Sequence, residues 1–262
     1  IVDTGIQWDH PDLAQNIWTN PGETGLDGFG RDRRSNAVDD DGNGFIDDWQ
    51  GWDFGGADFN NIVGDNNPHP TDGNNGHATH VGGIASARTD NVAGIAGVGF
   101  KCKLLNVKAT ADNDYRGSGG NALIIMGYEG IIYAADMGAK AINCSWGGEG
   151  YSQFEQDVIN YATGQGALVI AAAGNSSGLD LLVPTYPGAY ANVISVAATS
   201  NIDGKAYYSK YGSTIDVCAP GGNGTVTTSA IYSTAYPNTY GTQIRTSSST
   251  PHVTGLAGLV AS

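Results

Sequence analysis

The sequence predicts an α/β protein of three layers, in which helices cover both faces of a mostly parallel central sheet. Short apolar runs alternate with longer stretches of helical periodicity over the central part of the chain. Such alternation favours parallel strands joined by right-handed crossovers. Two of the apolar runs, 167–173 and 193–198, are nearly continuous, which is typical of strands buried on both faces. A chain of 262 residues can build one core of this kind, so we expect a single domain, 1–262.

The remaining elements follow in order along the chain. We expect strands at 104–107 and 141–144 and amphipathic helices at 121–138 and 154–165. The segment 22–70 differs from the rest, because it is rich in Asp, Asn and Gly, and we expect an ordered or ion-binding insertion there. The chain opens inside a strand motif and closes inside an apolar helical pattern, so we expect the domain to be incomplete at both ends.

The composition excludes several classes of protein. The net charge is −14, which disfavours nucleic acid and anionic membranes as partners and suits a protein that binds cations. No apolar run approaches the roughly 18 residues that a membrane span needs. The three cysteines, Cys102, Cys144 and Cys218, are too few for a disulfide framework and each lies beside a strand-like run. We expect all three to be small buried side chains.

Two motifs carry an acid and a base. Asp3 ends the first strand before a glycine turn, where its carboxylate can either orient a histidine or cap the turn. His77 and His80 are three residues apart, and both face one direction if a helix begins there. One of them can act as a base while the other packs, although two structural histidines remain an alternative. No Glu stands between them, as a zinc peptidase would need.

Two further motifs supply a nucleophile and an amide. Ser247 lies in a serine run before an apolar helix, at a helix N-terminus that favours developing negative charge; simple N-capping is the alternative. Asn175 follows the buried run 167–173, where its amide can donate to an oxyanion or merely form a turn. The conspicuous polar motifs thus fall at or near strand ends, the place where parallel sheets carry their active sites.

In this order the motifs resemble those of the subtilisin-like serine peptidases, the subtilases. Val2-Asp-Thr-Gly, His77-Ala-Thr-His-Val-Gly-Gly, Ala-Ala-Gly-Asn175 and the stretch from Arg245 to His252 each match a motif of that family. The resemblance extends over nearly the whole chain apart from 22–70. It implies a subtilisin-like fold and a serine endopeptidase with Asp3, His77 and Ser247 as its triad, Asn175 as the oxyanion donor and His80 as a structural residue.

The resemblance also implies a binding groove for extended polypeptide substrates. The substrate backbone would add a strand between 117–119 and 145–147. The residues that match the family's groove and primary pocket are Gly117, Ser118, Gly119, Ser145, Trp146, Gly147, Ala173, Gly174 and Thr185. None of them carries a charge, so we expect an apolar or uncharged residue before the cleaved bond.

A calcium loop is predicted inside the 22–70 segment. The stretch 39–48 follows the spacing of an EF-hand loop, with candidate ligands at Asp39, Asp41, Asn43, Phe45 and Asp47. The twelfth position is a glutamine instead of the usual glutamate and no helix precedes the loop, so it is only EF-like, and a solvated acidic turn is the alternative. Asp12 and Asn91 match positions that share a second calcium in many subtilases.

The family motif is broken two residues before the nucleophile. Arg245 stands where subtilases have a glycine, and its side chain could cover the primary pocket or point outward. An active endopeptidase therefore competes with a catalytically impaired pseudoenzyme or peptide-binding module on the same fold. From the habits of the family we expect a secreted or cell-surface protein, a propeptide outside this chain and a monomer.

Overall fold

The computed structural model describes residues 1–117, 122–224 and 227–262. Three short parallel strands, in the order β1-β3-β2, form one sheet: β1 (Val2–Asp3), β2 (Gly51–Asp53) and β3 (Asn106–Lys108). Four parallel strands in sequence order form a second: β4 (Ala141–Cys144), β5 (Leu168–Ala172), β6 (Val193–Thr199) and β7 (Val217–Pro220). β1 contacts β4, and the two sheets share one hydrophobic core. An antiparallel hairpin, β8 (Ile231–Ala235) and β9 (Thr239–Gln243), lies apart from them.

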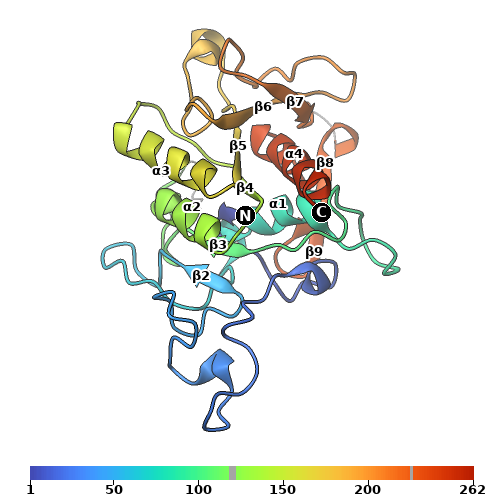
Figure 1. Cartoon of the computed structure of the whole chain (residues 1–262). Coiled ribbons are helices and arrows are strands. Elements are labelled where there is room, and N and C mark those ends of the chain that lie inside the picture. The colour runs from blue at the N-terminus through green and yellow to red at the C-terminus, as the bar shows by residue number, and fades with distance from the viewer. Residues whose placement is uncertain (118–121, 225–226) are drawn as a thin grey trace.

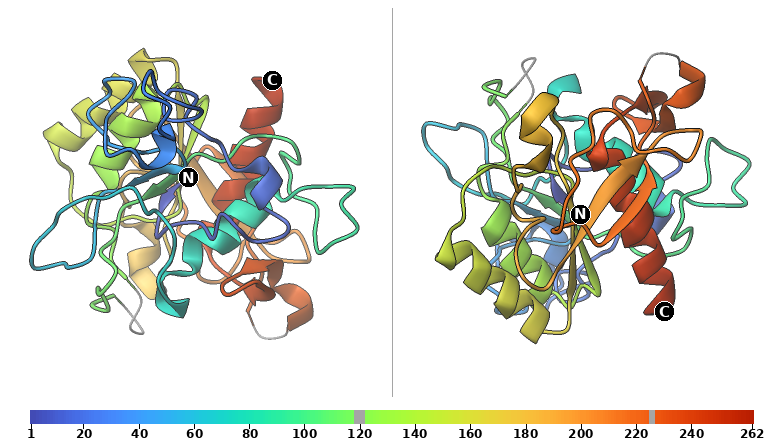
Figure 2. Two further views of the ribbon diagram at one scale, coloured as in Figure 1. Left: turned by 90° about the horizontal axis from the view of Figure 1, so that it is seen from below. Right: turned by 90° about the horizontal axis from the view of Figure 1, so that it is seen from above.

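Helices cover both faces of this strand layer, as Figures 1 and 2 show. On one face lie α2 (Gly127–Asp136) and α3 (Gln153–Gly164), and on the other lie α1 (His77–Ser86) and α4 (Thr246–Val260). The predicted three-layer α/β fold is therefore confirmed. Among the described residues, no helix is both long and apolar enough to cross a bilayer.

The helices α1 and α4 cross at close range because glycine stands at their contact. A Cβ atom on Gly255 would lie 2.5 Å from the Ala85 carbonyl oxygen and 2.9 Å from the Gly99 nitrogen. His77 is the first residue of α1, and Ser247 is the second residue of α4. The glycine contact thus holds together the two helices whose N-terminal turns carry the predicted base and nucleophile.

Most of the predicted element boundaries hold within two residues, and the helix expected at 121–138 is the main exception. α2 begins only at Gly127, because the backbone N–H groups of Ile125 and Met126 donate to the Ala109 carbonyl beyond the end of β3, at 2.9 and 3.1 Å. Short 3-10 turns complete the fold at Ala14–Asn16, Arg33–Ser35, Gly73–Asn75, Gly178–Leu182 and Thr227–Ser229.

The 22–70 segment contains one strand, β2, and otherwise runs as irregular turns that extend below the body in Figure 1. β2 is tied to the sheet by the fully buried Lys108, whose Nζ lies 2.9 Å from Asp53 Oδ2 and also donates to Asp112. The expected ordered insertion is therefore partly a strand of the sheet, and only its outer turns lie outside the common core.

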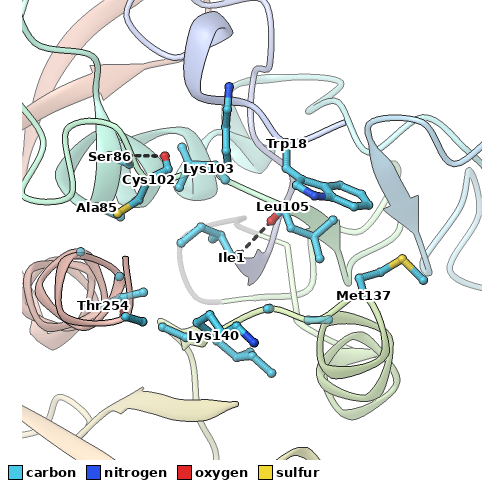
Figure 3. Close-up of a pocket in the computed structure, with 18 of the residues that line it drawn as sticks. Ile1, Trp18, Ala85, Ser86, Cys102, Lys103, Leu105, Met137, Lys140 and Thr254 are labelled. Carbon is cyan, nitrogen blue, oxygen red and sulfur yellow. Dashed lines mark hydrogen bonds between the residues drawn. The ribbon is translucent and has the colours of Figure 1, made fainter. Parts of the chain in front are cut away.

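A pocket of about 320 Å³ lies beside α2, α4 and the residues that precede β3 (Figure 3). Its lining includes Ile1, Trp18, Leu105, Met137, Lys140 and Thr254, and none of the predicted catalytic side chains. The Ile1 amino group donates to the Leu105 carbonyl at 2.9 Å, and Ser86 Oγ donates to the Cys102 carbonyl at 2.6 Å.

The cysteines only partly follow the prediction. Cys144 is buried in β4, but Cys102 is half-buried and Cys218 is exposed. The prediction is wrong for Cys218 because successive strand residues point to opposite faces of the sheet: the neighbouring Ala219 packs toward α4, and Cys218 lies on the other face, where it is exposed.

Candidate active site

The predicted acid and base are hydrogen-bonded. His77 Nδ1 donates to Asp3 Oδ1 at 2.8 Å, joining the end of β1 to the start of α1. Asp3 is 1% exposed, whereas the His77 side chain keeps 30% of its surface. The other carboxylate oxygen, Oδ2, is buried and has no hydrogen-bond partner in the described part of the chain. A buried carboxylate thus fixes the tautomer of a partly open imidazole, and His77 Nε2 remains available for proton transfer.

Thr4 holds this pair in place, a role that the sequence motifs did not reveal. Its backbone N–H donates to Asp3 Oδ1 at 2.7 Å, and its hydroxyl accepts from the Ala78 N–H at 3.0 Å. The same hydroxyl donates to the Asn75 carbonyl at 2.8 Å. One threonine therefore contacts both the acid and the first turn of the helix that carries the base.

The two histidines differ in their surroundings. Burial lowers the pKa of the His77 imidazole, but the charge and the hydrogen bond of Asp3 outweigh it and leave the pKa above its ordinary value. His80 is 1% exposed, its Nε2 lies 3.1 Å from the Ile231 carbonyl, and burial first and then His77 lower its pKa to about 4. His80 therefore packs α1 against β8 as a neutral ring, in agreement with its predicted structural role.

Ser247 occupies the first turn of α4, at 8% exposure. Its carbonyl accepts a hydrogen bond from Ser145 Oγ at 2.9 Å, and Ser145 Oγ accepts one from Asn143 Nδ2 at 2.9 Å. Thr254, two turns further along α4, donates to Asn143 Oδ1 at 2.9 Å. These buried polar groups hydrogen-bond the end of β4 to α4 at two points, Ser247 and Thr254. They therefore hold the first turns of α4, including the backbone of Ser247, against the sheet.

Asn175 is hydrogen-bonded through its amide oxygen to the first residue of α4. Its Oδ1 accepts from the Thr246 N–H at 2.9 Å and from the Thr246 hydroxyl at 3.1 Å. Because Thr246 occupies the carbonyl end of the amide, the NH₂ end remains available as a hydrogen-bond donor. Asn175 is exposed, and it lines the same pocket as Ser247.

A cleft of about 780 Å³ contains Asp3, His77 and Ser247 in its walls. No hydrogen bond of 3.5 Å or less joins His77 to Ser247, both of which are described. Catalytic contacts in ligand-free sites are often long and tighten when substrate binds. The predicted triad is thus gathered into one cleft, with its acid–base half already hydrogen-bonded.

A pocket of about 270 Å³ opens beside Ser247 and corresponds to the predicted primary pocket. Ser145, Trp146, Gly147, Gly174 and Thr185 line it as predicted. Ala173 does not, although its two neighbours Ala172 and Gly174 do, because successive residues of an extended chain point to opposite sides. Gly117 lines neither this pocket nor the cleft, and the predicted Ser118 and Gly119 lie outside the described residues.

The expectation of an uncharged pocket is wrong. Lys210 and Glu149 both line it, with Lys210 Nζ 3.8 Å from Glu149 Oε1. The Lys210 side chain is 7% exposed and the Glu149 side chain 69%. Lys210 reaches the pocket because its N–H donates to the Gly174 carbonyl at 3.1 Å, a pairing of distant segments that no local motif signals. Thr185 Oγ1 is buried there without a hydrogen-bond partner in the described residues.

Arg245 turns away from this pocket. Its backbone is extended, with φ 161° and ψ 171°, and its guanidinium carbon lies 5.4 Å from the centre of the Tyr208 ring. Arg245 lines the wall of the cleft but not the primary pocket. The exposed Arg245 side chain therefore lies beside Tyr208 at the edge of the cleft and does not cover the primary pocket.

Comparison with known proteins gives the family. The sequence profile described as "Subtilase family" matches residues 1–262. The chain belongs to the subtilase family. It is 40% identical over 262 residues to thermitase of Thermoactinomyces vulgaris, covering all of this chain and 74% of that protein. It is 36% identical over 262 residues to a thermophilic serine proteinase of Bacillus sp. strain AK1, of which it spans 51%. This subtilase is accordingly a serine endopeptidase.

Solved structures agree with the fold. A protease of Pseudoalteromonas arctica superposes with a TM-score of 0.74 at 27% identity, over 99% of this chain and 75% of that one. Sphericase superposes with a TM-score of 0.71 at 28% identity, again over 99% and 75%. The 22–70 segment is thus carried on a subtilisin-like framework, which confirms the predicted fold.

In the EF-like loop of this subtilase, the side chains of the predicted ligands Asp39, Asn43 and Asp47 accept hydrogen bonds from nearby backbone N–H groups. Asp39 accepts hydrogen bonds from the N–H groups of Gly42, Asn43 and Gly44, and both oxygens of Asp47 accept from the Ala37 N–H. Asn43 Oδ1 accepts from the Phe45 N–H at 2.7 Å. These hydrogen bonds shape the turn, and among the described residues Asp39, Asp41 and Asp47 do not form a group of carboxylates within 4.8 Å of one another. Of the predicted set, only Asp41 joins a cluster of carboxylates, with Glu23 and Asp48, which the sequence did not single out.

Asp12 and Asn91, which the family resemblance assigns to a second calcium site, are hydrogen-bonded to each other. Asn91 Nδ2 donates to Asp12 Oδ1 at 2.6 Å. Asp12 Oδ2 accepts from the Ile95 N–H at 2.8 Å and from the Tyr240 hydroxyl at 3.2 Å. The fully buried Asp12 carboxylate therefore organises the loop around residue 91 through neutral donors.

Proposed function

We propose that this subtilase cleaves peptide bonds through an Asp3–His77–Ser247 triad and an acyl-enzyme. The observation that supports it best is the 2.8 Å bond between Asp3 and His77 in the cleft that Ser247 also lines. Ser247 Oγ attacks the carbonyl carbon while His77 Nε2 takes its proton and then passes it to the leaving amine. Asp3 keeps the imidazole in the required tautomer and stabilises the imidazolium. Water then repeats the attack and releases the acyl group.

The oxyanion binds to two donors at the start of α4. Asn175 Nδ2 is one, because Thr246 occupies the opposite end of the amide at 2.9 and 3.1 Å. The backbone N–H of Ser247, in the first turn of the helix, is the other. Both are held by the protein before the substrate arrives, so charge that develops on the oxygen meets donors that are already oriented.

Polypeptide substrates lie extended along Ser145–Gly147 and add a strand there. This mode of recognition reads the backbone, so it gives little sequence preference by itself, and the primary pocket supplies the selectivity. The buried ammonium of Lys210 and the unpaired hydroxyl of Thr185 favour a side chain that accepts hydrogen bonds. A glutamate before the cleaved bond fits best: its carboxylate displaces the exposed Glu149 and pairs with Lys210.

The alternative of an impaired pseudoenzyme rests on Arg245. Its outward orientation toward Tyr208 and the open pocket beside Ser247 favour an active enzyme instead. The same proposal includes a calcium ion shared by Asp12 and Asn91. It also includes secretion, a propeptide outside this chain and a monomeric state. The name of one relative, a halolysin-like extracellular serine protease of Natrialba magadii that is 34% identical over 262 residues, supports secretion.

A covalent probe tests the proposal. We would expose the protein and its Ser247→Ala variant to a fluorophosphonate and to an unfolded protein substrate in the presence of calcium. Labelling and cleavage by the wild type, both lost in the variant, support the triad. A folded wild-type protein that neither labels nor cleaves contradicts it. Activity gained on Arg245→Gly substitution would then point to the pseudoenzyme.

A further inference from the structure

Arg245 places a positive charge in the wall of the catalytic cleft, two positions before Ser247. Its backbone is fixed on both sides, because its N–H donates to the Gly221 carbonyl at 3.1 Å and its carbonyl accepts from the Ser248 N–H at 3.1 Å. A Cβ atom on Gly221 would lie 2.9 Å from the Arg245 carbonyl oxygen, so the glycine permits this close contact. The point from which the Arg245 side chain extends is therefore fixed relative to the nucleophile.

The guanidinium group has an aromatic partner but no acidic one. Its central carbon lies 5.4 Å from the centre of the Tyr208 ring. Tyr208 is buried, and its hydroxyl donates to the Gly221 and Gly222 carbonyls at 2.6 and 2.8 Å, so the ring is a fixed support. Within residues 1–117, 122–224 and 227–262, no carboxylate lies within 4.0 Å of the Arg245 guanidinium. Its N–H donors are therefore available to an anion that enters the cleft.

Arg245 also lies where the leaving part of a substrate passes. Ser145, Trp146 and Ser247 line both the cleft and the primary pocket, whereas His77 and Arg245 line only the cleft. The base must reach the leaving amine to return its proton, so the chain beyond the cleaved bond runs through the part of the site that His77 lines. A substrate whose preceding side chain fills the primary pocket thus brings its leaving residues toward the cleft wall that contains the guanidinium.

We propose that Arg245 binds a carboxylate on the leaving part of the substrate. Cleavage is then favoured just before an acidic residue or close to the C-terminus of a peptide. The inference rests on the proposed function and adds a second point of selection to that of the primary pocket. A guanidinium supported on an aromatic ring presents its planar N–H donors in a geometry that fits the two oxygens of a carboxylate. Acidic side chains and peptide C-termini share this chemistry, so the experiment must separate them.

Peptides that differ only after the cleaved bond test the assignment. All share one acyl part and end after two leaving residues, which are Glu-Gln, Gln-Glu or Gln-Gln, each with a terminal carboxylate or amide. Active protein gives kcat/KM, and calorimetric titration of Ser247→Ala protein gives Kd for the uncleaved peptides. Arg245→Gln removes the charge, and Arg245→Lys keeps the charge without the planar donors. The control Lys205→Gln removes an exposed charge outside the cleft, three positions before Tyr208.

The wild type should prefer a peptide with a carboxylate to the Gln-Gln amide by about three- to tenfold in kcat/KM and in affinity, a modest ratio because Arg245 is exposed. Arg245→Gln should lose this preference, Arg245→Lys should retain part of it, and Lys205→Gln should retain all of it. The peptide that shows the preference identifies the source as a side chain or a C-terminus. The proposal is wrong if the wild type shows no preference in kcat/KM or Kd, or if the preference persists in Arg245→Gln.

Failure of the triad gives a different result. A fluorophosphonate contains no leaving peptide, so its reaction with Ser247 does not depend on a carboxylate bound at Arg245. A wild-type protein that is not labelled contradicts the proposed function, while the affinities measured with Ser247→Ala protein still decide the role of Arg245. A labelled protein without any carboxylate preference supports the triad and overturns the assignment of Arg245.

Discussion

At the scale of single residues, the site contains some residues that belong to recognisable sequence motifs and others that reach it only because the chain folds. Asp3, His77, Asn175 and Ser247 were predictable because each sits in a short motif at the end of a strand or the start of a helix. Lys210 was not, because it enters the pocket through a backbone hydrogen bond to Gly174, 36 positions away in the sequence. The charged side chains of the primary pocket therefore could not be predicted from the sequence alone.

Removing the charge of Asp3 should change both the rate and its pH dependence. Asp3 keeps the pKa of His77 above its ordinary value despite burial, so in Asp3→Asn the acid limb of kcat/KM should move to lower pH. The wrong tautomer should lower kcat by about 10⁴. Initial rates from pH 5 to pH 10 on a peptide substrate measure both. The control is Asp9→Asn, at a half-exposed carboxylate beside His69, and it should change neither. An unmoved acid limb would contradict the coupling.

The substrate preference should depend on Lys210. In Lys210→Met the ratio of kcat/KM for glutamate over phenylalanine before the cleaved bond should fall about 10- to 100-fold, since a charged hydrogen bond is worth roughly 1.5–3 kcal/mol. Glu149→Gln should raise the same ratio by removing the competing carboxylate. Peptides that differ at this single position measure the effect. If the wild type prefers phenylalanine and Lys210→Met leaves the ratio unchanged, Lys210 does not select a charged side chain. That result would not contradict the proposed triad.

At the scale of elements, the geometry of catalysis depends on how α1 and α4 cross. The base and the nucleophile lie in the first turns of these two helices, and Gly255 permits their close contact. The helix α4 was predictable from the apolar periodicity that follows the serine motif. The late start of α2 was not, since hydrogen bonds to the Ala109 carbonyl, just beyond the end of β3, outweigh the local helical pattern of 121–126.

A methyl group at the crossing should impair catalysis and stability together. In Gly255→Ala the new Cβ would meet the Ala85 carbonyl oxygen at 2.5 Å, so α1 and α4 must separate. We expect a loss of about 1–3 kcal/mol in the free energy of unfolding and a lower kcat with little change in KM. The control Gly164→Ala, at a helical glycine whose Cβ meets nothing within 4 Å, should stabilise α3 slightly. Urea unfolding measures the stability, and steady-state kinetics measure kcat and KM. An unchanged kcat in Gly255→Ala would show that the spacing of α1 and α4 does not control catalysis.

At the scale of the whole molecule, charge is distributed unevenly. The 22–70 segment carries eleven of the 26 acidic side chains and only three of the 12 basic ones, so it holds more than half of the net charge of −14. The sequence predicted cation binding there from this excess. It did not single out the group of Glu23, Asp41 and Asp48, because the EF-like spacing is local, whereas Glu23 meets the two aspartates only through the path of the folded turns.

Salt should therefore stabilise the protein when calcium is absent. With EDTA and the Ser247→Ala background, raising NaCl from about 0.02 to 0.5 M shortens the screening length several-fold and weakens repulsion among exposed carboxylates. We expect the melting temperature to rise by a few degrees, and by less in saturating calcium. Differential scanning fluorimetry measures it. An equal rise in both conditions would show that the bound ion does not relieve the repulsion.

Lys210 and Glu149 form a 3.8 Å ion pair in the primary pocket, so the Glu149 carboxylate competes with any incoming carboxylate for Lys210. Glu149 lies only four positions beyond Ser145, so its carboxylate stays near Lys210 at a high effective concentration even when no substrate is present. Dilute carboxylic acids in the surroundings would rarely displace it. A peptide, whose backbone is held along the groove at the same time, brings its own carboxylate to comparable local concentration. The enzyme would thus ignore free anions and respond to the same group when it is presented on a chain.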